Sequence, residues 1–348
     1  MSKSIKKSFA VSRRRFLKGT GMGAGALAFG GAFPLSAQAQ ETFVWYSGLA
    51  TAITDDISKM FTKKTGIEVE YFRAGSNNLA QKFEQEVKAD QVRCSTVQIT
   101  NPTLVGLWAK QGLVLPYESP EFVNYPEEFV IKGFAGPSTV NPHVLCYNTE
   151  LVSPEDAPKH WEDILDPKWK GKLVMTDGSS SSSALHWFTV MKYTFGDAFV
   201  EKLATQDVLM VTGGAAVGDI LISGERAMAV MITQAHAGKA ISRGGALRIV
   251  VPEEGVPLLN GVIFVPAKAP NPEVGKQFVD HMLGEEVQSM MGNKHFVGSL
   301  RKGLPPSELD TGAKQASEVT ALLSSPEDLL RFQAERESLS QQYVELYK

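Results

Sequence analysis

Three strand patterns alternate with three helix patterns early in the chain, and this order constrains the fold more than any other feature. Strands are predicted over 42–46, 67–72 and 96–100 from buried or alternating apolar residues. Amphipathic helices follow each strand, the third opening at Asn101, with Pro102 suited to a first helical turn. Such alternation produces βαβ crossovers and a mostly parallel sheet, whose ligands bind beyond the carboxyl ends of the strands.

The middle of the chain repeats this alternation. Further strands are predicted over 144–147, 173–175, 227–232, 247–251 and 258–265, and further helices over 182–193, 215–223, 273–283 and from 325 onward. No linker rich in Pro, Gly or charge separates the two groups, which favours two lobes joined by crossing strands. The predicted fold is α/β with two lobes, each a mostly parallel sheet flanked by helices, and a ligand cleft between them.

The first 39 residues have the order of an export signal. Seven Lys and Arg residues precede an apolar stretch rich in Gly and Ala, which ends in the small-x-small sequence AQA at 37–39. The stretch is shorter and less apolar than a membrane-spanning helix requires. The sequence SRRRFLK at 12–18 resembles a twin-arginine motif, an address for export in the folded state. We therefore expect residues 1–39 to be cleaved and the mature protein to be periplasmic.

Removal of this segment makes the chain clearly acidic. The full sequence has 35 basic and 38 acidic residues, and seven basic but no acidic ones lie before residue 40, so the mature net charge is about −10. Binding to nucleic acid or an anionic membrane through a basic surface is disfavoured. Cys94 and Cys146 lack metal-ligand spacing, and either one disulfide or two buried thiols is compatible with the sequence.

Five segments, in order along the mature chain, resemble the solute-binding proteins of ABC transporters. The similarity is strongest to the branch that binds ferric iron, phosphonates and sugar phosphates, and WEDILDPKWKGK is its most specific part. The segments are VWYSG at 44–48, FTKKTGIEV at 61–69, WEDILDPKWKGK at 161–172, ISGE at 222–225 and NPEVGKQFV at 271–279.

The resemblance implies a hinged, two-lobed receptor that closes on a solute and delivers it to a permease in the inner membrane. It implies no catalytic residues and no cofactor, and a monomer is expected. Lobe 1 is expected to comprise 40–143 plus 262–310, and lobe 2 to comprise 144–261 plus 311–348.

The positions that bind iron in ferric members carry other residues here. The resemblance places Ala50 where those members have a histidine, Thr100 where they have a carboxylate, and Ala235 with His236 where they have two tyrosines. Fe³⁺ is a hard cation that needs anionic oxygen ligands. No protein metal site is therefore predicted, and iron binding would require coordination supplied by the ligand itself.

The resemblance implies that the anion half of the ferric site is retained and enlarged. The family loop that holds an anion at a helix N-terminus matches 176–180, within the run TDGSSSSS. Helix N-termini offer unpaired N–H groups and partial positive charge, and serine hydroxyls add donors. Gly178, Ser179, Ser180 and Ser181 are therefore predicted to bind an anion. The alternative is that one serine caps the helix and the others are solvated.

Other candidates come from the predicted cleft loops and the crossing strands. His236 is equally compatible with a surface helix, Tyr46 with a core aromatic, and Gly214 with a plain turn. The predicted ligand-binding residues outside the serine run are Tyr46, Ser47, Thr51, Ser76, Thr100, Asn101, Gly214, Thr233, Gln234, His236 and Asn260.

The sequence thus predicts a periplasmic protein that binds a small organic anion without catalysis. A phosphonate such as 2-aminoethylphosphonate, a phosphate ester or a carboxylate fits, and an ammonium group would meet Asp or Glu near the cleft. The alternatives are ferric iron with ligand-supplied coordination, a polyamine- or thiamine-like cation, and an exported cofactor enzyme. The last has no support from GxSxG, HExxH or CxxCH motifs, which are absent.

Overall fold

A computed structural model describes residues 43–323 and 325–347. The predicted export signal lies outside these residues. The described residues all belong to one compact unit. Its helices are α1 (Thr51–Thr65), α2 (Ser76–Lys88), α3 (Pro102–Lys110), α4 (Ser182–Phe195), α5 (Asp197–Ala204), α6 (Gly214–Ser223), α7 (Gln234–Ser242), α8 (Pro272–Leu283), α9 (Glu285–His295) and α10 (Pro326–Tyr347). Short 3₁₀ helices span Pro120–Asn124, Glu127–Phe129, Trp161–Leu165, Pro167–Trp169 and Ala316–Glu318.

Nine strands form one continuous sheet in the described part of the chain. Its order is β2-β1-β3-β9-β4-β7-β5-β6, with β8 also paired to β4. The strands β1 and β2, β1 and β3, β5 and β6, and β5 and β7 run parallel, as expected for βαβ units. The strands are β1 (Phe43–Ser47), β2 (Val69–Arg73), β3 (Thr96–Ile99), β4 (Ala135–Asn148), β5 (Leu173–Thr176), β6 (Leu209–Val211), β7 (Met228–Thr233), β8 (Leu247–Val250) and β9 (Leu258–Phe264).

The long strand β4 joins the two groups of strands. Its first part pairs antiparallel with β9, and its second part pairs antiparallel with β7 and β8. The sequence predicted only residues 144–147 of it, because Pro137 and Pro142 argue against a central strand. A register shift between Pro137 and Thr139 accommodates the first proline. The antiparallel centre was therefore not predicted, although the outer βαβ units were.

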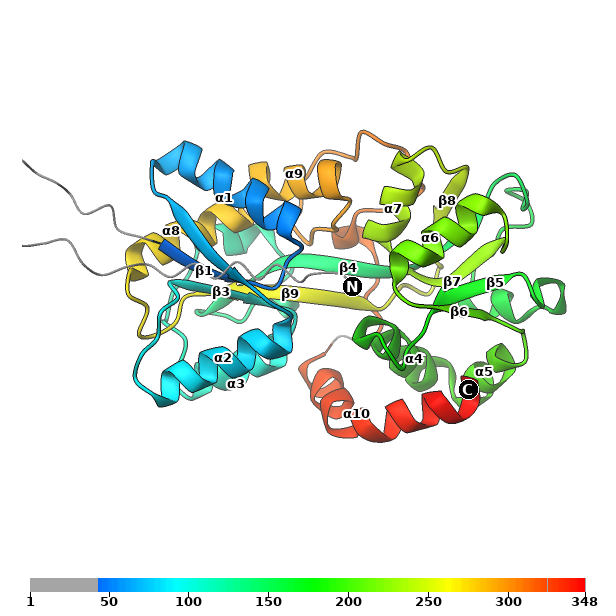
Figure 1. Ribbon diagram of the computed structural model, residues 1–348, viewed down its shortest axis with the longest axis horizontal. Coiled ribbons are helices and arrows are strands. Elements are labelled where there is room, and N and C mark those ends of the chain that lie inside the picture. Colours follow the sequence, from blue (N-terminus) through cyan, green and yellow to red (C-terminus); the bar gives the residue numbers. More distant parts are fainter. Residues whose placement is uncertain (1–42, 324, 348) are drawn as a thin grey trace, which may run out of the picture. The chain divides into compact units, whose positions relative to one another are not determined.

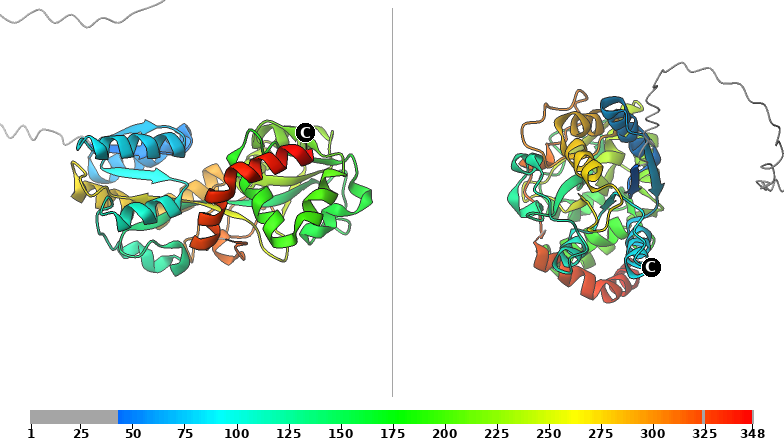
Figure 2. Two further views of the ribbon diagram at one scale, coloured as in Figure 1. Left: turned by 90° about the horizontal axis from the view of Figure 1, so that it is seen from below. Right: turned by 90° about the vertical axis from the view of Figure 1, so that its left-hand side faces the viewer.

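Helices cover both faces of each group of strands (Figures 1 and 2). Figure 1 shows α1, α8 and α9 on one face of β1–β3, with α2 and α3 on the other. Beyond β4, α6 and α7 cover one face of β5–β7, and α4, α5 and α10 cover the other. This is the predicted α/β, two-lobed arrangement. The exact division of the chain between the lobes stays a prediction, since β4 belongs to both.

Aromatic packing fixes α2 and α3 against the sheet. Phe83 of α2 lies 4.9 Å from Trp108 of α3 and 5.7 Å from Phe264 of β9, between ring centroids. Leu79 and Phe83 are fully buried and form the apolar face of the amphipathic helix α2. Because such aromatic clusters bury large apolar areas, the N-termini of both helices have defined positions at the sheet edge.

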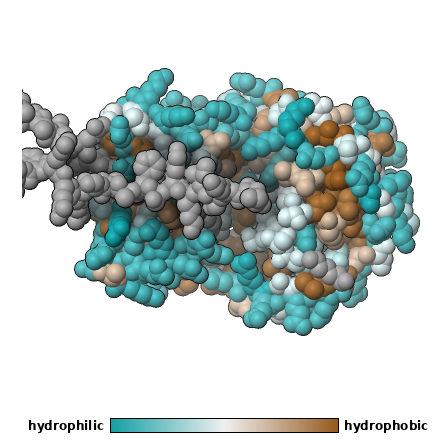
Figure 3. Space-filling view, viewed as in Figure 1, coloured by the Kyte–Doolittle hydropathy of each residue, from teal (hydrophilic) through white to brown (hydrophobic). Residues whose placement is uncertain are grey.

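Both cysteines are buried free thiols, so no disulfide links them. Burial raises the pKa of Cys146 to about 12. Within the described residues, no helix has the length and apolar character needed to cross a membrane. Hydrophilic side chains cover most of the face seen in Figure 3, including that over α2, and apolar ones gather over α6 and the neighbouring strands.

Candidate functional site

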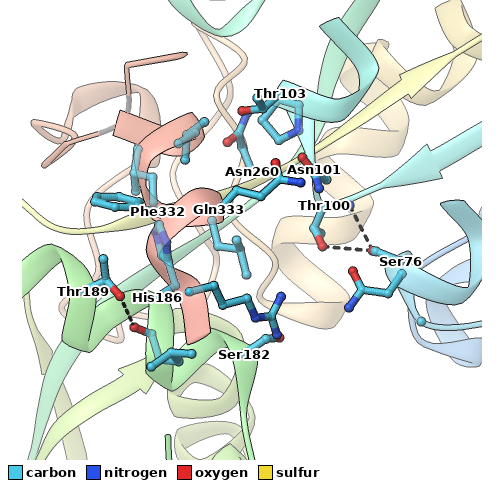
Figure 4. A pocket seen from close by; sticks show the side chains of 18 of the residues that line it. Ser76, Thr100, Asn101, Thr103, Ser182, His186, Thr189, Asn260, Phe332 and Gln333 are labelled. Atoms are coloured by element: carbon cyan, nitrogen blue, oxygen red, sulfur yellow. Dashed lines mark hydrogen bonds between the residues drawn. The ribbon is translucent and has the colours of Figure 1, made fainter. Parts of the chain in front are cut away.

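A cavity of about 520 Å³ lies among the start of α2, the start of α3, α4, β9 and α10. Figure 4 shows its polar side chains, which come from both sides of the crossing strands. Four of the predicted ligand residues line it, namely Ser76, Thr100, Asn101 and Asn260. The other lining residues are Gly75, Asn77, Asn78, Pro102, Thr103, Ser182, Leu185, His186, Thr189, Leu258, Leu259, Leu329, Phe332, Gln333 and Arg336.

The N-termini of α2 and α3 form one wall of this cavity. The Ser76 and Thr100 hydroxyl oxygens lie 2.9 Å apart, and the Thr100 N–H donates to Ser76 Oγ at 3.0 Å. Helix α3 is capped by Asn101, whose Oδ1 accepts from the Leu104 N–H at 3.0 Å, as the Asn-Pro sequence predicted. Helix α2 follows Gly75 and has no side-chain cap. Its first N–H groups therefore lack intrahelical partners and carry partial positive charge.

Asn260 reaches the cavity from β9, one of the crossing strands. The residue is only 6% exposed. The neighbouring Thr103 hydroxyl is buried and has no hydrogen-bond partner among the described residues. Figure 4 shows Asn101, Thr103 and Asn260 gathered at the same end of the cavity. Because buried polar groups are nearly always hydrogen-bonded, the unpaired Thr103 hydroxyl favours a polar ligand or water in the cavity.

The opposite wall comes from α4. The Thr189 hydroxyl donates to the Leu185 carbonyl at 2.8 Å, so its oxygen can still accept. The His186 ring lies 5.7 Å from that of His143, between ring centroids. Burial lowers the pKa of His186 to about 4. His186 is therefore neutral at neutral pH and contributes no positive charge to the site.

The third wall is the C-terminal helix α10, which contributes Phe332, Gln333 and Arg336. Arg336 is exposed and forms no ion pair with any described residue. It is the one lining residue that carries a full charge at neutral pH, since no Asp or Glu of the described chain lines the cavity. The sequence predicted the helix, but periodicity alone does not show which of its residues reaches a cavity.

The serine run spans the start of α4, since Ser179 to Ser181 precede the helix and Ser182 and Ser183 begin it. Much of the hydrogen bonding of the first three is internal. Ser181 caps the helix by accepting from the Ala184 N–H at 3.3 Å, as the alternative interpretation predicted. Ser179 donates to Asp177 from both its N–H and its hydroxyl, each at 2.9 Å. The Ser180 hydroxyl donates to the Asp177 carbonyl at 3.2 Å. The cavity is lined by the next serine, Ser182, rather than by these three.

Gly178 is buried against α10. A Cβ on this glycine would lie 2.8 Å from the Tyr343 ring, closer than real Cβ contacts allow. The absence of a side chain at Gly178 is therefore explained by packing. Binding of an anion by residues 178–181 stays a prediction.

A second group of predicted residues gathers at the starts of α6 and α7. Thr233 Oγ1 lies 2.7 Å from His236 Nδ1, and a Cβ on Gly214 would lie 2.6 Å from that same nitrogen. Burial lowers the pKa of His236. Gln234 lines a different cavity of about 530 Å³, together with Gly238 and Phe296.

The predicted ligand residues around the end of β1 lie outside the lining of the 520 Å³ cavity. Tyr46 is 2% exposed, and its hydroxyl donates to Glu86 Oε1 at 2.6 Å, so its side chain lies in the core. Ser47 is fully buried, with its Oγ 2.9 Å from Thr54 Oγ1. Thr51 is exposed at the start of α1. None of the three lines the cavity, and Tyr46 matches the alternative of a core aromatic.

No group of three or more His, Cys, Asp or Glu residues suited to a metal ion occurs among the described residues. The chemistry of the cavity agrees with this, because amides, hydroxyls and one arginine are poor ligands for a hard trivalent cation. The arrangement provides donors for oxygen atoms, and among the described residues that line the cavity no hydroxyl is hydrogen-bonded to a histidine.

The chain belongs to the family of bacterial extracellular solute-binding proteins, whose sequence model matches residues 56–316. A putative 2-aminoethylphosphonate-binding periplasmic protein of Salmonella typhimurium is 23% identical over 258 residues, which is 71% of this chain and 74% of the relative. The family resemblance predicted from the five sequence segments is thereby confirmed.

Two solved structures share the fold. Iron-bound HitA from Pseudomonas aeruginosa superposes with a TM-score of 0.71 at 22% identity, covering 87% of this chain and 99% of HitA. AfuA from Actinobacillus pleuropneumoniae, with exogenous fructose-6-phosphate bound, superposes with a TM-score of 0.65 at 20% identity, covering 88% of this chain and 99% of AfuA. The protein is thus a periplasmic solute-binding protein, not an enzyme, of the class that serves the membrane components of ABC transporters.

Proposed function

We propose that this protein binds a small organic anion in the 520 Å³ cavity and delivers it to an ABC-transporter permease. The observation that carries the proposal is the charge of the cavity lining. Arg336 is its charged residue, two helix N-termini point toward it, and no carboxylate of the described chain lines it. A cation such as a polyamine or thiamine has no acidic partner there, which leaves the anion as the better fit.

Magnitudes support the preference for an anion. A hydrogen bond to a charged group contributes about 1.5–3 kcal/mol, and each helix N-terminus about 0.3–1 kcal/mol. Because Arg336 is exposed, its contribution belongs at the lower end of that range. Closure of the cavity around the solute would exclude water and strengthen the contributions of Arg336 and of the N-termini of α2 and α3.

Closure requires the two lobes to move about the strands that join them. We propose that β4 and β9 act as this hinge, with lobe 1 comprising 40–143 plus 262–310 and lobe 2 comprising 144–261 plus 311–348. The cavity is lined from both proposed lobes, Ser76 and Thr100 on one side and His186 and Arg336 on the other. A solute bridging these walls would favour the closed state through its extra contacts.

A phosphonate, a phosphate ester and a carboxylate are the candidate solutes. Two similar proteins support the first two classes. One is named as a putative 2-aminoethylphosphonate-binding protein, and the other, AfuA, has fructose-6-phosphate bound. The start of α4, including residues 178–181, is proposed as an additional source of donors if closure brings it to the solute. The same closure would bring Gly214, Thr233, Gln234 and His236 nearer.

Calorimetric titration of residues 40–348 tests the proposal. The panel contains alkylphosphonates, phosphate esters and carboxylates, with spermidine, thiamine, and Fe³⁺ with and without citrate as the competing classes. We expect saturable binding for at least one organic anion and none for the cations. Binding of spermidine, thiamine or iron without binding of any organic anion would overturn it.

A further inference from the structure

The polar groups of the cavity are almost all neutral. Its amides come from α2, α3, β9 and α10, and its hydroxyls from α2, α3 and α4. Such groups hydrogen-bond hydroxyl, carbonyl or phosphoryl oxygens equally well. A buried ammonium needs more than this, because without an anionic partner its desolvation is poorly compensated.

Three carboxylates on the surrounding elements are engaged elsewhere. Glu86 of α2 accepts from Tyr46 and pairs with Lys82 at 2.8 Å. Glu335 of α10 pairs with Arg331 and accepts from the Tyr193 hydroxyl. Asp177, before α4, accepts from Ser179. None of these three lines the cavity, so an ammonium there would find no carboxylate to neutralise it.

The charged wall is held in place by its packing on α4. Phe332 stacks on Tyr193 with centroids 5.6 Å apart and an interplanar angle of 9°. Arg331 lies over the same Tyr193 ring at 3.8 Å. Further along α10, Tyr343 is fully buried. These contacts fix the face of α10 that carries Gln333 and Arg336, which lowers the entropic cost of using both residues for binding.

Building on the proposed function, we propose that α10 determines solute selectivity. Arg336 binds the anionic group of the solute, Gln333 hydrogen-bonds its neutral part, and the absence of a cavity carboxylate rejects solutes that also carry an ammonium. The preferred solute is thus an anion with a neutral, hydrogen-bonding remainder. This narrows the class proposed above and disfavours 2-aminoethylphosphonate itself.

Three matched pairs of probes test the selectivity. They are ethylphosphonate with 2-aminoethylphosphonate, glycerol 3-phosphate with phosphoethanolamine, and butyrate with 4-aminobutyrate. We expect any pair that binds residues 40–348 to show at least roughly tenfold tighter binding of the member without the ammonium. Equal or tighter binding of the ammonium member would overturn the selectivity while leaving anion binding intact.

The variant Arg336→Gln tests the counter-charge. We expect about 10- to 100-fold weaker binding of the anion that binds best, because one charge-assisted hydrogen bond is lost. Arg243→Gln is the matched control, since Arg243 is equally exposed but pairs with Asp219 at 2.7 Å and lines no part of the cavity. Gln333→Ala should weaken binding of the same anion by a smaller factor.

The outcomes separate the two proposals. If no probe anion binds the wild-type protein, the anion function fails for all three classes, and the selectivity fails with it. If an anion binds but Arg336→Gln and Arg243→Gln have the same affinity as wild type, only the role of α10 is refuted. Thermal unfolding of each variant shows whether it is folded, and the exposed Arg336 side chain forms no ion pair with a described residue that the substitution would break.

Discussion

The starts of α4 and α2 are two helix N-termini of opposite character. The start of α4 lies within a run of five serines, yet Ser181 caps it and Ser179 and Ser180 bond to Asp177. The start of α2 follows Gly75, has no cap and opens on the cavity. A hydroxyl-rich segment is thus partly occupied by its own backbone, whereas the plainer segment leaves its donors free for a ligand. Changes near α4 should mainly affect stability, and changes near α2 should mainly affect affinity.

Acidification should give the largest effect on stability. It acts on the α4 wall, which contains His186, and the described α2 wall of the cavity contains no histidine. Burial lowers the pKa of folded His186 to about 4, whereas an unfolded histidine titrates near 6.5. Between these values the unfolded state binds the extra proton. The contribution of His186 to the free energy of unfolding should therefore fall as pH decreases from about 6.5 to 4, by up to about 3 kcal/mol, and level off below.

Urea unfolding at pH 7 and pH 4.5 measures this loss. His186→Gln is the comparison variant, since it removes the titrating group while His143 remains in both proteins. We expect the variant to lose less stability than wild type on acidification. An identical loss in the two proteins would contradict the assignment to His186.

The next largest effect concerns the packing of the serine run against α10. Gly178→Ala would place a methyl 2.8 Å from the Tyr343 ring. Overpacking of this kind costs about 1–3 kcal/mol. Denaturant unfolding should show this loss. A control glycine must have negative φ, which excludes Gly303 with its φ of 75°. Gly106→Ala is suitable, since it has open space and lies in α3.

Removal of the α4 cap should have an intermediate effect. Ser181→Ala deletes the acceptor for the Ala184 N–H, which typically costs about 1 kcal/mol. Ser180→Ala, one residue earlier, removes a hydroxyl that is exposed and should cost less. If Ser181→Ala instead leaves stability unchanged but weakens anion binding, Ser181 acts on the solute and the contrast between the two helix starts is wrong.

The smallest effect on stability is expected at the start of α2. Gly75→Ser would supply the missing cap and raise the free energy of unfolding by a few tenths of a kcal/mol. The new hydroxyl would also compete with the solute for the helix N–H groups, so affinity should fall. Thermal unfolding and calorimetry on the same sample measure both. Unchanged affinity would show that these N–H groups do not contact the solute.

Local patterns predicted the elements well where a single segment determines them. The Asn101-Pro102 start of α3 and the buried Leu79 and Phe83 follow directly from capping and amphipathic spacing. The first half of β4 was missed, because its prolines are tolerated only through a register shift and antiparallel partners far away in the sequence. A strand defined by such distant partners has no local signature.

The candidate site was predictable in part for the same reason. Ser76, Thr100 and Asn101 lie at strand ends, so the fold class alone places them near one another. Arg336 had no such signal, since its role depends on which face of α10 packs on α4. Tyr46 illustrates the reverse case, because a residue at the end of a strand can still turn into the core when Glu86 accepts its hydroxyl.

The place of α10 beside the cavity has a consequence for how affinity is measured. Phe332, Gln333 and Arg336 line the cavity from this one helix. A fluorescent label attached to the cavity face of α10 would therefore lie beside the solute and alter the binding that it reports. A label on α5, which contributes no residue to the cavity lining, avoids this interference.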